Sequence, residues 1–272
     1  MISAGALAAD PNTELDGLES RVGGGIGVAA IETRSSREVK HRSDQRFPMC
    51  STFKLLATAA VLKRVDQGRE RLDRFVPYTA KDLLEYAPVT RLHLKEGGMK
   101  VGDLCAAAIE QSDNTAANLL LASLRGPQAV TEFARTLGDQ VTRLDRIEPE
   151  LNNWAPGDDR DTTTPAAMVG DLKRVLSGDV LSSRSRDQLE SWLEQNQTGA
   201  GMIRASVPAG WKIGDKTGRG ANGATNDVAI LRSPSGETIF LAIYTVGSSK
   251  TPDERAGTVA KVAKLTLDAL TK

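Results

Sequence analysis

The sequence contains few of the residues that mark several classes of protein. Aromatic residues make up only 4% of its 272 residues, and it has two histidines and two cysteines. Lysine plus arginine and aspartate plus glutamate both number 35, so no net charge draws the chain to nucleic acid or to an anionic membrane. No apolar run reaches the ~18 residues of a membrane-spanning helix. We therefore expect small molecules, and neither nucleic acid nor a membrane, as partners.

The scarce histidines and cysteines argue against two further kinds of site. His41 and His93 have no second histidine and no cysteine at ligand spacing, which argues against a histidine-based metal site. We expect both to be surface or hydrogen-bonded residues. Cys50 and Cys105 permit one disulfide, but each lies in an apolar helical context where free thiols pack as small hydrophobic groups. We expect two free, buried thiols.

The length and composition are those of an ordinary globular protein. With 40% hydrophobic residues, a chain of 272 residues can bury a sizeable core, and we expect one compact unit of two lobes. Residues 1–10 lack the basic region and the long apolar region of a signal peptide, so we expect a mature chain.

Strand patterns lie near the two ends of the chain. Residues 26–33 and 38–41 predict a hairpin, and three further strands are expected at 211–217, 227–232 and 237–246. Helices are expected at 11–22, ended by glycines, and from Thr251 to the C-terminus. Between residues 51 and about 195 the signals are almost wholly helical.

These patterns predict an α/β fold with two lobes. An antiparallel sheet of about five strands is flanked by the terminal helices, and an all-helical lobe is inserted into it, with a cleft between the lobes. We place the α/β lobe at residues 1–43 and 200–272, and the helical lobe at 44–199. Residues 218–223 match G-x-G-x-x-G, but they precede a strand where a dinucleotide site needs a helix, so a hairpin connection is expected there.

The stretch from Ser51 to Lys54 places a hydroxyl nucleophile one helical turn before an amine. The apolar run 55–62 follows, so we expect Ser51 at the N-terminal end of a buried helix with Lys54 on the same face. Backbone N–H groups there favour developing negative charge, which suits an oxyanion. Because S-x-x-K recurs by chance about once per 240 residues, an N-cap serine followed by a surface lysine is the plain alternative.

Three other stretches offer polar groups where the chain bends. Ser112-Asp113-Asn114 lies between two helical runs, and its alternative is an ordinary helix N-cap. Lys216-Thr217-Gly218 ends a strand, and its alternative is a routine strand end. A loop of about 146–161 opens at Arg146 and closes near Asp161, which could pair across its neck. A glutamate such as Glu148 inside that loop is otherwise part of a solvated charged surface.

Taken together, these stretches resemble the class A β-lactamases, within the wider family of penicillin-recognising serine enzymes. S-x-x-K, S-D-N and K-T-G follow in that order, and E-x-x-L-N from Glu148 to Asn152 separates this class from its transpeptidase relatives. The resemblance covers residues 25–270. It implies hydrolysis of penicillins and cephalosporins, antibiotic resistance, no metal or organic cofactor, and a periplasmic or secreted monomer.

The resemblance also implies residue roles. The expected catalytic residues are Ser51, Lys54, Ser112, Glu148 and Lys216, and the expected substrate-binding residues are Tyr86, Asn114, Asn152, Thr217, Gly218 and Arg219. Ser51 would attack the lactam carbonyl, and whether Lys54 or Glu148 activates it is disputed for the family. Glu148 would hold the deacylating water with Asn152, and its peptide bond to Pro149 would be cis. The N–H groups of Ser51 and Arg219 would form the oxyanion hole.

The sequence departs from the family pattern at two places. Some relatives that hydrolyse carbapenems join the cysteine before the nucleophile to one after K-T-G, but Gly220 stands opposite Cys50 here, so that bridge cannot form. Many class A enzymes also carry an extra arginine where this chain has Thr225 and Ala256. Arg219 could supply that charge beside Thr217, or it could only solubilise the strand edge.

Three alternatives remain at this point. A penicillin-binding transpeptidase would share Ser51, Lys54, Ser112 and Lys216 but would not require Glu148 with Asn152. A sensor would be acylated and stop, and a structural protein would have no use for the whole set. The number of turnovers on a chromogenic cephalosporin separates them.

Overall fold

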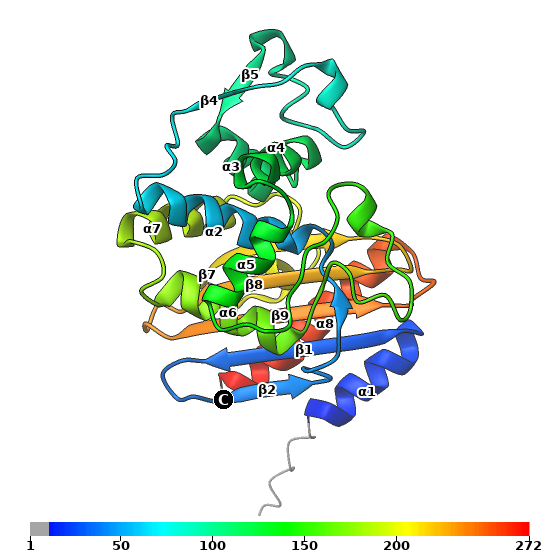
Figure 1. Ribbon diagram of the computed structural model, residues 1–272. Helices are drawn as coiled ribbons and strands as arrows, with labels where there is room; N and C mark the ends of the chain where they lie inside the picture. Colours follow the sequence, from blue (N-terminus) through cyan, green and yellow to red (C-terminus); the bar gives the residue numbers. More distant parts are fainter. Residues whose placement is uncertain (1–10, 272) are drawn as a thin grey trace, which may run out of the picture.

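A five-stranded antiparallel sheet forms the centre of the protein, in the computed structural model that describes residues 11–271 (Figure 1). Its order is β2-β1-β9-β8-β7, and every neighbouring pair is antiparallel. The strands are β1 Gly25–Glu32, β2 Glu38–His41, β7 Lys212–Arg219, β8 Thr225–Arg232 and β9 Thr238–Val246. The expected number and direction of the strands are confirmed.

The two terminal helices cover one face of this sheet. They are α1 Pro11–Val22 and α8 Pro252–Leu270, which contact each other and share one core with the sheet. Successive side chains of β9 point to opposite faces of the sheet, so the strand contributes to a core on each face. Leu241 and Ile243 join the core beneath α1 and α8, while Phe240 and Tyr244 join the core on the opposite face.

Helix α8 begins where its sequence directs it to begin. Thr251 Oγ1 accepts a hydrogen bond from Glu254 N, and Glu254 Oε2 accepts one from Thr251 N, which closes a capping box. Pro252 occupies the first helical turn, where a missing N–H costs nothing.

The other helices lie on the opposite face of the sheet. They are α2 Phe53–Asp66, α3 Val101–Glu110, α4 Asn114–Leu124, α5 Gln128–Thr136, α6 Pro165–Ser177 and α7 Ser183–Glu194. Helix α2 is buried from Phe53 to Leu62 on every side, which explains its continuous apolar run. Helices α6 and α7 pack directly on the sheet. The lobe boundaries at 43/44 and 199/200 remain a prediction.

The helical part is not wholly helical, which corrects the expectation. Strands β3 Phe47–Pro48 and β6 Thr162–Thr163 form one small sheet, and β4 Phe75–Pro77 and β5 Gly98–Lys100 form another. Strands of two or three residues are too short to show a period of two in the sequence. Short 3₁₀ helices lie at η1 Cys50–Thr52, η2 Ala80–Asp82, η3 Leu94–Glu96, η4 Glu150–Asn152 and η5 Ile203–Ser206.

Several smaller expectations have clear outcomes. The glycine-rich stretch after residue 218 connects β7 to β8 in a hairpin, as predicted. Cys50 and Cys105 are free and buried, also as predicted. None of the helices within residues 11–271 is long and apolar enough to cross a membrane. The expectation for residues 1–10 lies outside the described part of the chain.

The two histidines have different surroundings. His93 is partly exposed and bonds Glu96 through Nδ1 at 2.7 Å, as expected. His41 is only 8% exposed, and its Nε2 has no hydrogen-bond partner, so the expectation of a surface or hydrogen-bonded residue is wrong for that ring nitrogen. Its side chain is buried because His41 and Val39 occupy the same face of β2, against α1.

Candidate active site

Ser51 lies in the 3₁₀ turn η1, directly before α2 and against the end of β7. The prediction placed it at the N-terminal end of a helix, and the 3₁₀ turn is the local form of that end. Cys50, the preceding residue, has a φ of 47°, a conformation that costs a non-glycine residue about 1–3 kcal/mol. Packing of η1 against β7, β8 and α2 must therefore stabilise this conformation. Ser51 itself is only 9% exposed.

Lys54 lies one helical turn beyond Ser51 and is completely buried. Its ammonium donates to Asn114 Oδ1 at 2.6 Å and to the backbone oxygen of Ser112 at 2.8 Å. It also pairs with Glu148 Oε1 at 3.0 Å. A surface lysine behind an N-cap serine is thus excluded, because every partner of this amine belongs to a predicted motif.

Glu148 brings the loop to the serine. Ser51 Oγ donates to Glu148 Oε1 at 3.1 Å, and Asn152 Nδ2 donates to Glu148 Oε2 at 2.6 Å. The Glu148 side chain is completely buried, and its peptide bond to Pro149 is cis, as expected. The alternative of a solvated charged residue is therefore wrong for Glu148.

Ser112 joins the two lysines of the site. Lys216 Nζ donates to Ser112 Oγ at 3.0 Å, and Lys54 Nζ lies 3.4 Å from the same oxygen. Ser112 has a φ of 56°, and the N-cap of α4 is the next residue, Asp113, whose carboxylate accepts a hydrogen bond from Ala116 N at 2.8 Å. The cap explanation thus applies to Asp113 and leaves Ser112 free to face the lysines.

Both buried amines lose their proton more readily than an exposed lysine does. Burial, followed by repulsion from Lys54, lowers the pKa of Lys216 to about 7. Burial also lowers the pKa of Lys54, although the charge of Glu148 opposes the change. A neutral amine next to Ser51 can accept a proton, and a charged Lys216 can bind an anion.

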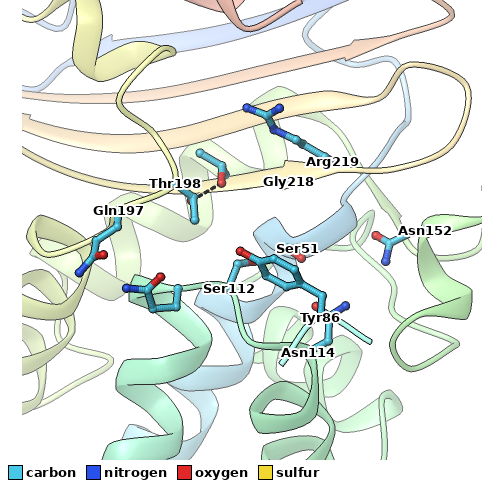
Figure 2. A pocket seen from close by; sticks show the side chains of 11 residues that line it. Ser51, Tyr86, Ser112, Asn114, Asn152, Gln197, Thr198, Gly218 and Arg219 are labelled. Carbon is cyan, nitrogen blue, oxygen red and sulfur yellow. Dashed lines mark hydrogen bonds between the residues drawn. The ribbon is translucent and has the colours of Figure 1, made fainter. Parts of the chain in front are cut away.

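A cleft of about 560 Å³ opens above these groups (Figure 2). Its lining consists of Ser51, Tyr86, Gln111, Ser112, Asn114, Asn152, Gln197, Thr198, Thr217, Gly218 and Arg219. Every predicted substrate-binding residue is present, and Tyr86 is 51% exposed at the rim. The cleft thus has the size and the convergent polar groups of a small-molecule site.

The end of β7 approaches Ser51 closely because it carries a glycine. A Cβ on Gly218 would lie 2.8 Å from Met49 O and 3.1 Å from Ser51 N. Any side chain there would push the strand away from the serine. The two N–H groups predicted to form the oxyanion hole belong to Ser51 and to Arg219, which directly follows this glycine.

The neck of the loop closes on one buried carboxylate. Asp161 accepts hydrogen bonds from Asp145 N at 2.7 Å and Arg146 N at 2.9 Å, and Arg146 Nε donates to it at 2.5 Å. The predicted pairing of Arg146 with Asp161 therefore exists in the structure. It closes the loop that carries Glu148.

Arg219 lines the cleft but does not face the serine. Its side chain is exposed, and Figure 2 shows the guanidinium turned away from Ser51. A second arginine lies nearby, because Arg255 Nε donates to Thr225 Oγ1 at 3.0 Å and Thr225 pairs with Arg219 across the hairpin. Arg255 directly precedes Ala256, the position at the start of the last helix where the family arginine was expected, and was not predicted from the sequence.

Two further polar residues were not singled out from the sequence. Asn118 on α4 holds the backbone of Glu148, donating to Glu148 O at 2.8 Å and accepting from Glu148 N at 2.9 Å. Thr198 and Thr217 share a hydrogen bond of 2.5 Å at the cleft wall. Asn118 lies one helical turn after Asn114, which is the only sequence signal that could have indicated it.

The cleft is poorly suited to a metal ion. The described residues that line it include no carboxylate, histidine or cysteine, and Glu148 beneath them is paired with Lys54 Nζ at 3.0 Å. A cation would find no free ligand there and would be repelled by the amine, whereas an anionic ligand would be attracted. Gly220 does face the buried Cys50, since a Cβ on it would lie 2.6 Å from Sγ.

Comparisons with known proteins agree with this geometry. The family described as the beta-lactamase enzyme family matches residues 10–270. Beta-lactamase OXY-2 of Klebsiella oxytoca is 41% identical over 99% of this chain and 94% of its own length. Beta-lactamase L2 of Stenotrophomonas maltophilia is 46% identical over 93% of this chain and 84% of its own.

Solved structures give the same result for the fold. An ancestral class A β-lactamase, called GNCA, superposes with a TM-score of 0.93 at 53% identity, covering 96% of this chain and 100% of that one. The putative class A β-lactamase PenP of Rhodopseudomonas palustris superposes with a TM-score of 0.93 at 49% identity, covering 95% and 99%.

Proposed function

The chain belongs to the class A β-lactamase family, and on this premise we propose that it hydrolyses penicillins and cephalosporins through an ester on Ser51. The observation that carries the proposal is a pair of contacts at the cleft floor. Glu148 Oε1 lies 3.1 Å from Ser51 Oγ and 3.0 Å from Lys54 Nζ. A hydroxyl, a carboxylate and an amine with a lowered pKa are the parts that an acyl transfer to water requires.

In the first half-reaction Ser51 Oγ attacks the lactam carbonyl. Its proton passes to Lys54 or, through a water molecule, to Glu148, and the N–H groups of Ser51 and Arg219 stabilise the oxyanion. The C–N bond of the lactam then breaks. Ser112 gives its proton to the departing nitrogen, and Lys216, 3.0 Å from Ser112 Oγ, supports that transfer.

In the second half-reaction water replaces the serine. Glu148, held by Asn152 and Asn118, takes a proton from a water molecule that attacks the ester carbonyl. Ser51 Oγ leaves with a proton, and the opened product departs. Asn114 and Tyr86 would contact the acylamino side chain, and Thr217 would bind the substrate carboxylate together with Lys216.

Counting turnovers on a chromogenic cephalosporin tests this proposal. Many turnovers per chain are expected, and the rate should survive a strong chelator because no step uses a metal. A single stoichiometric burst would instead support a transpeptidase or a sensor. Loss of activity in chelator, restored by zinc, would contradict the serine mechanism.

The charge of Lys216 should appear in the pH profile. Since its pKa is lowered to about 7, the charge that binds the carboxylate is present below that pH and is lost above it. We expect kcat/KM, which reports the free enzyme, to fall as pH rises through this region. In Lys216→Arg the guanidinium stays charged up to about pH 12. The alkaline limb of the variant's kcat/KM profile should therefore move upward by more than about two pH units.

The alkaline limb of the pH profile shows whether Lys216 or Lys54 is the titrating amine. If the profile of Lys216→Arg keeps the alkaline limb of the wild type, the titrating group is another one, with Lys54 the first candidate, and Lys216 does not bind the carboxylate through its charge. Michaelis constants at each pH should show the change mainly in KM.

Arg219 is proposed to add positive charge for the substrate carboxylate after its side chain turns into the cleft. A charge-assisted hydrogen bond is worth about 1.5–3 kcal/mol, so Arg219→Ala should lower kcat/KM by roughly 10- to 100-fold, mainly through KM. Rising salt should weaken the wild type more than the variant. Steady-state kinetics on several penicillins and cephalosporins measure both effects.

Arg255→Ala is the matched control for Arg219. It removes an arginine that also lies beside Thr225 but does not line the cleft. If Arg219→Ala stays within about twofold of the wild type, Arg219 only solubilises the edge, since even ~1 kcal/mol would cost about fivefold. If only Arg255→Ala is impaired, the extra charge comes from α8.

We also propose a periplasmic or secreted location and a monomeric state. Membership of the family supports export. The chain has no net charge that calls for a partner, and a small-molecule ligand needs no second protein chain to bind it. Cell fractionation and light scattering on the purified protein test the two statements separately.

A further inference from the structure

A cluster of possible metal ligands lies outside the cleft, where α1 packs against β2. Asp16, Glu19 and His41 each offer one ligand atom, and these atoms all lie within 4.8 Å of one another. Asp16 and Glu19 are three positions apart on α1 and therefore share one face of the helix. His41 ends β2, 22 residues further along the chain than Glu19, so the sequence alone gives no ligand spacing.

The imidazole of His41 supplies an independent sign of a binding site. The residue is 8% exposed, and its Nε2 has no hydrogen-bond partner. This nitrogen lies 4.0 Å from Asp16 Oδ1, which is too long for a hydrogen bond. A buried nitrogen without a hydrogen-bond partner is unfavourable, and here it faces a carboxylate across a gap that an ion or a water molecule can fill.

We propose that Asp16, Glu19 and His41 bind one Zn²⁺ ion, with water as the fourth ligand. One imidazole nitrogen and two carboxylate oxygens are a donor set that zinc accepts, with bonds of about 2.0–2.2 Å. Donor atoms of such a tetrahedral site lie roughly 3.3 Å apart. His41 Nε2 and Asp16 Oδ1, now 4.0 Å apart, therefore have to approach by roughly 0.7 Å, and no pair within the 4.8 Å limit by more than about 1.5 Å.

Asp16 is the ligand that moves. Its side chain is 68% exposed, so rotation about its side-chain bonds can bring Oδ1 toward His41. The other two ligands have less freedom. His41 is buried, and Glu19 Oε1 accepts a hydrogen bond from Ile26 N at 2.9 Å. Zinc binding would therefore have to order only one side chain, that of Asp16, which keeps the entropic cost of binding small.

Arg42 is the competing cation. Its guanidinium donates to Glu19 Oε2 at 2.6 Å, and its side chain is 41% exposed. Zinc at Glu19 Oε1 shares the carboxylate with this arginine, and repulsion between the two cations moves Arg42 outward into water. Removing Arg42 is thus expected to tighten zinc binding.

Bound zinc would join the N-terminal helix to the edge strand of the sheet. It would stabilise the folded chain by mass action and leave hydrolysis unchanged, because none of the three ligands lines the cleft. This separates the proposal from the reaction mechanism, which uses no metal.

The test uses the untagged full chain, freed of metal with a chelator and titrated with ZnCl₂ in a calorimeter, with Co²⁺ absorption as a second signal. The wild type is expected to bind one Zn²⁺ per chain and to melt at a higher temperature with zinc. Loss of an outer-shell partner already costs 10- to 100-fold in metal affinity, so Asp16→Asn and His41→Gln should each weaken binding by at least about tenfold.

The chain offers matched controls for both substitutions. His93→Gln removes the only other histidine, and Glu14→Gln removes an exposed acid of the same helix, so both should bind zinc as the wild type does. Arg42→Gln should bind more tightly. If His41→Gln fails to fold, Asp16→Asn, at an exposed position, decides the question.

Three outcomes would overturn the proposal. The wild type could show no saturable zinc binding, or His93→Gln could lose it while His41→Gln keeps it, which would mean adventitious surface binding. Equal affinity of Asp16→Asn and the wild type would also remove the cluster as the site. β-Lactam hydrolysis serves as the check that every variant is folded.

Discussion

Replacing Glu148 with alanine should leave Ser51 able to open a penicillin but unable to release it, with turnover lowered by about 10²- to 10⁴-fold. Among the described residues, Glu148 is the only carboxylate bonded to Ser51. Its removal also takes away the charge that raises the pKa of Lys54, so the amine loses its proton more easily. Acylation therefore keeps a base, whereas the water that must attack the ester has none.

Mass spectrometry of the intact variant after mixing with penicillin measures the outcome. We expect a persistent adduct of one penicillin per chain, absent when Ser51→Ala is added. Glu150→Gln, an exposed acid in the same loop, is the control and should turn over as the wild type does. Turnover near the wild-type rate in Glu148→Ala would remove Glu148 from the mechanism.

Replacing Asp161 with alanine should destabilise the protein by about 3–5 kcal/mol, because it leaves a guanidinium and two backbone N–H groups without their acceptor. The Asp161 side chain is 1% exposed, and the three hydrogen bonds it accepts close the loop neck. At about 2–4 °C per kcal/mol, the melting temperature should fall by roughly 6–20 °C. Deacylation should slow as well, since the loop carries Glu148.

Two further variants separate charge from hydrogen bonding at this neck. Asp161→Asn keeps an oxygen for the two backbone N–H groups and loses the pairing with Arg146, so its loss of stability should be smaller. Asp159→Ala removes an exposed acid 3.8 Å from Arg46 and should change stability by no more than about 0.5 kcal/mol. Calorimetric melting of Asp161→Ala within 2 °C or so of the wild type would contradict the argument.

The sequence predicted the parts that repeat a pattern over many residues. The sheet could be predicted because β1, β8 and β9 are long enough to show strand patterns, and α8 because its capping box is written in four residues. Helix α2 followed from its continuous apolar run, since only a fully buried helix tolerates one.

The parts that escaped prediction depend on contacts between distant residues. Strands β3 and β6 pair two residues each across 114 to 116 positions of the chain, so no local sequence pattern indicates the pairing. Asn118 and Arg255 resemble ordinary polar helix residues until the fold brings them to Glu148 and Thr225. His41 escaped for the same reason, because Asp16 and Glu19 reach it only after α1 packs on β2.

Strand β7 lies at the edge of the sheet and pairs with β8 alone. An open edge is normally a hazard, because its backbone groups can pair with another chain and start aggregation. Here α7 and η1 pack against β7, and Gly218 of this strand lies close to Ser51 at the cleft. The end of the edge strand therefore faces a site for a small molecule. An amide of a bound β-lactam could pair with it as an added strand would, so the same backbone groups that make an open edge a hazard would serve in binding.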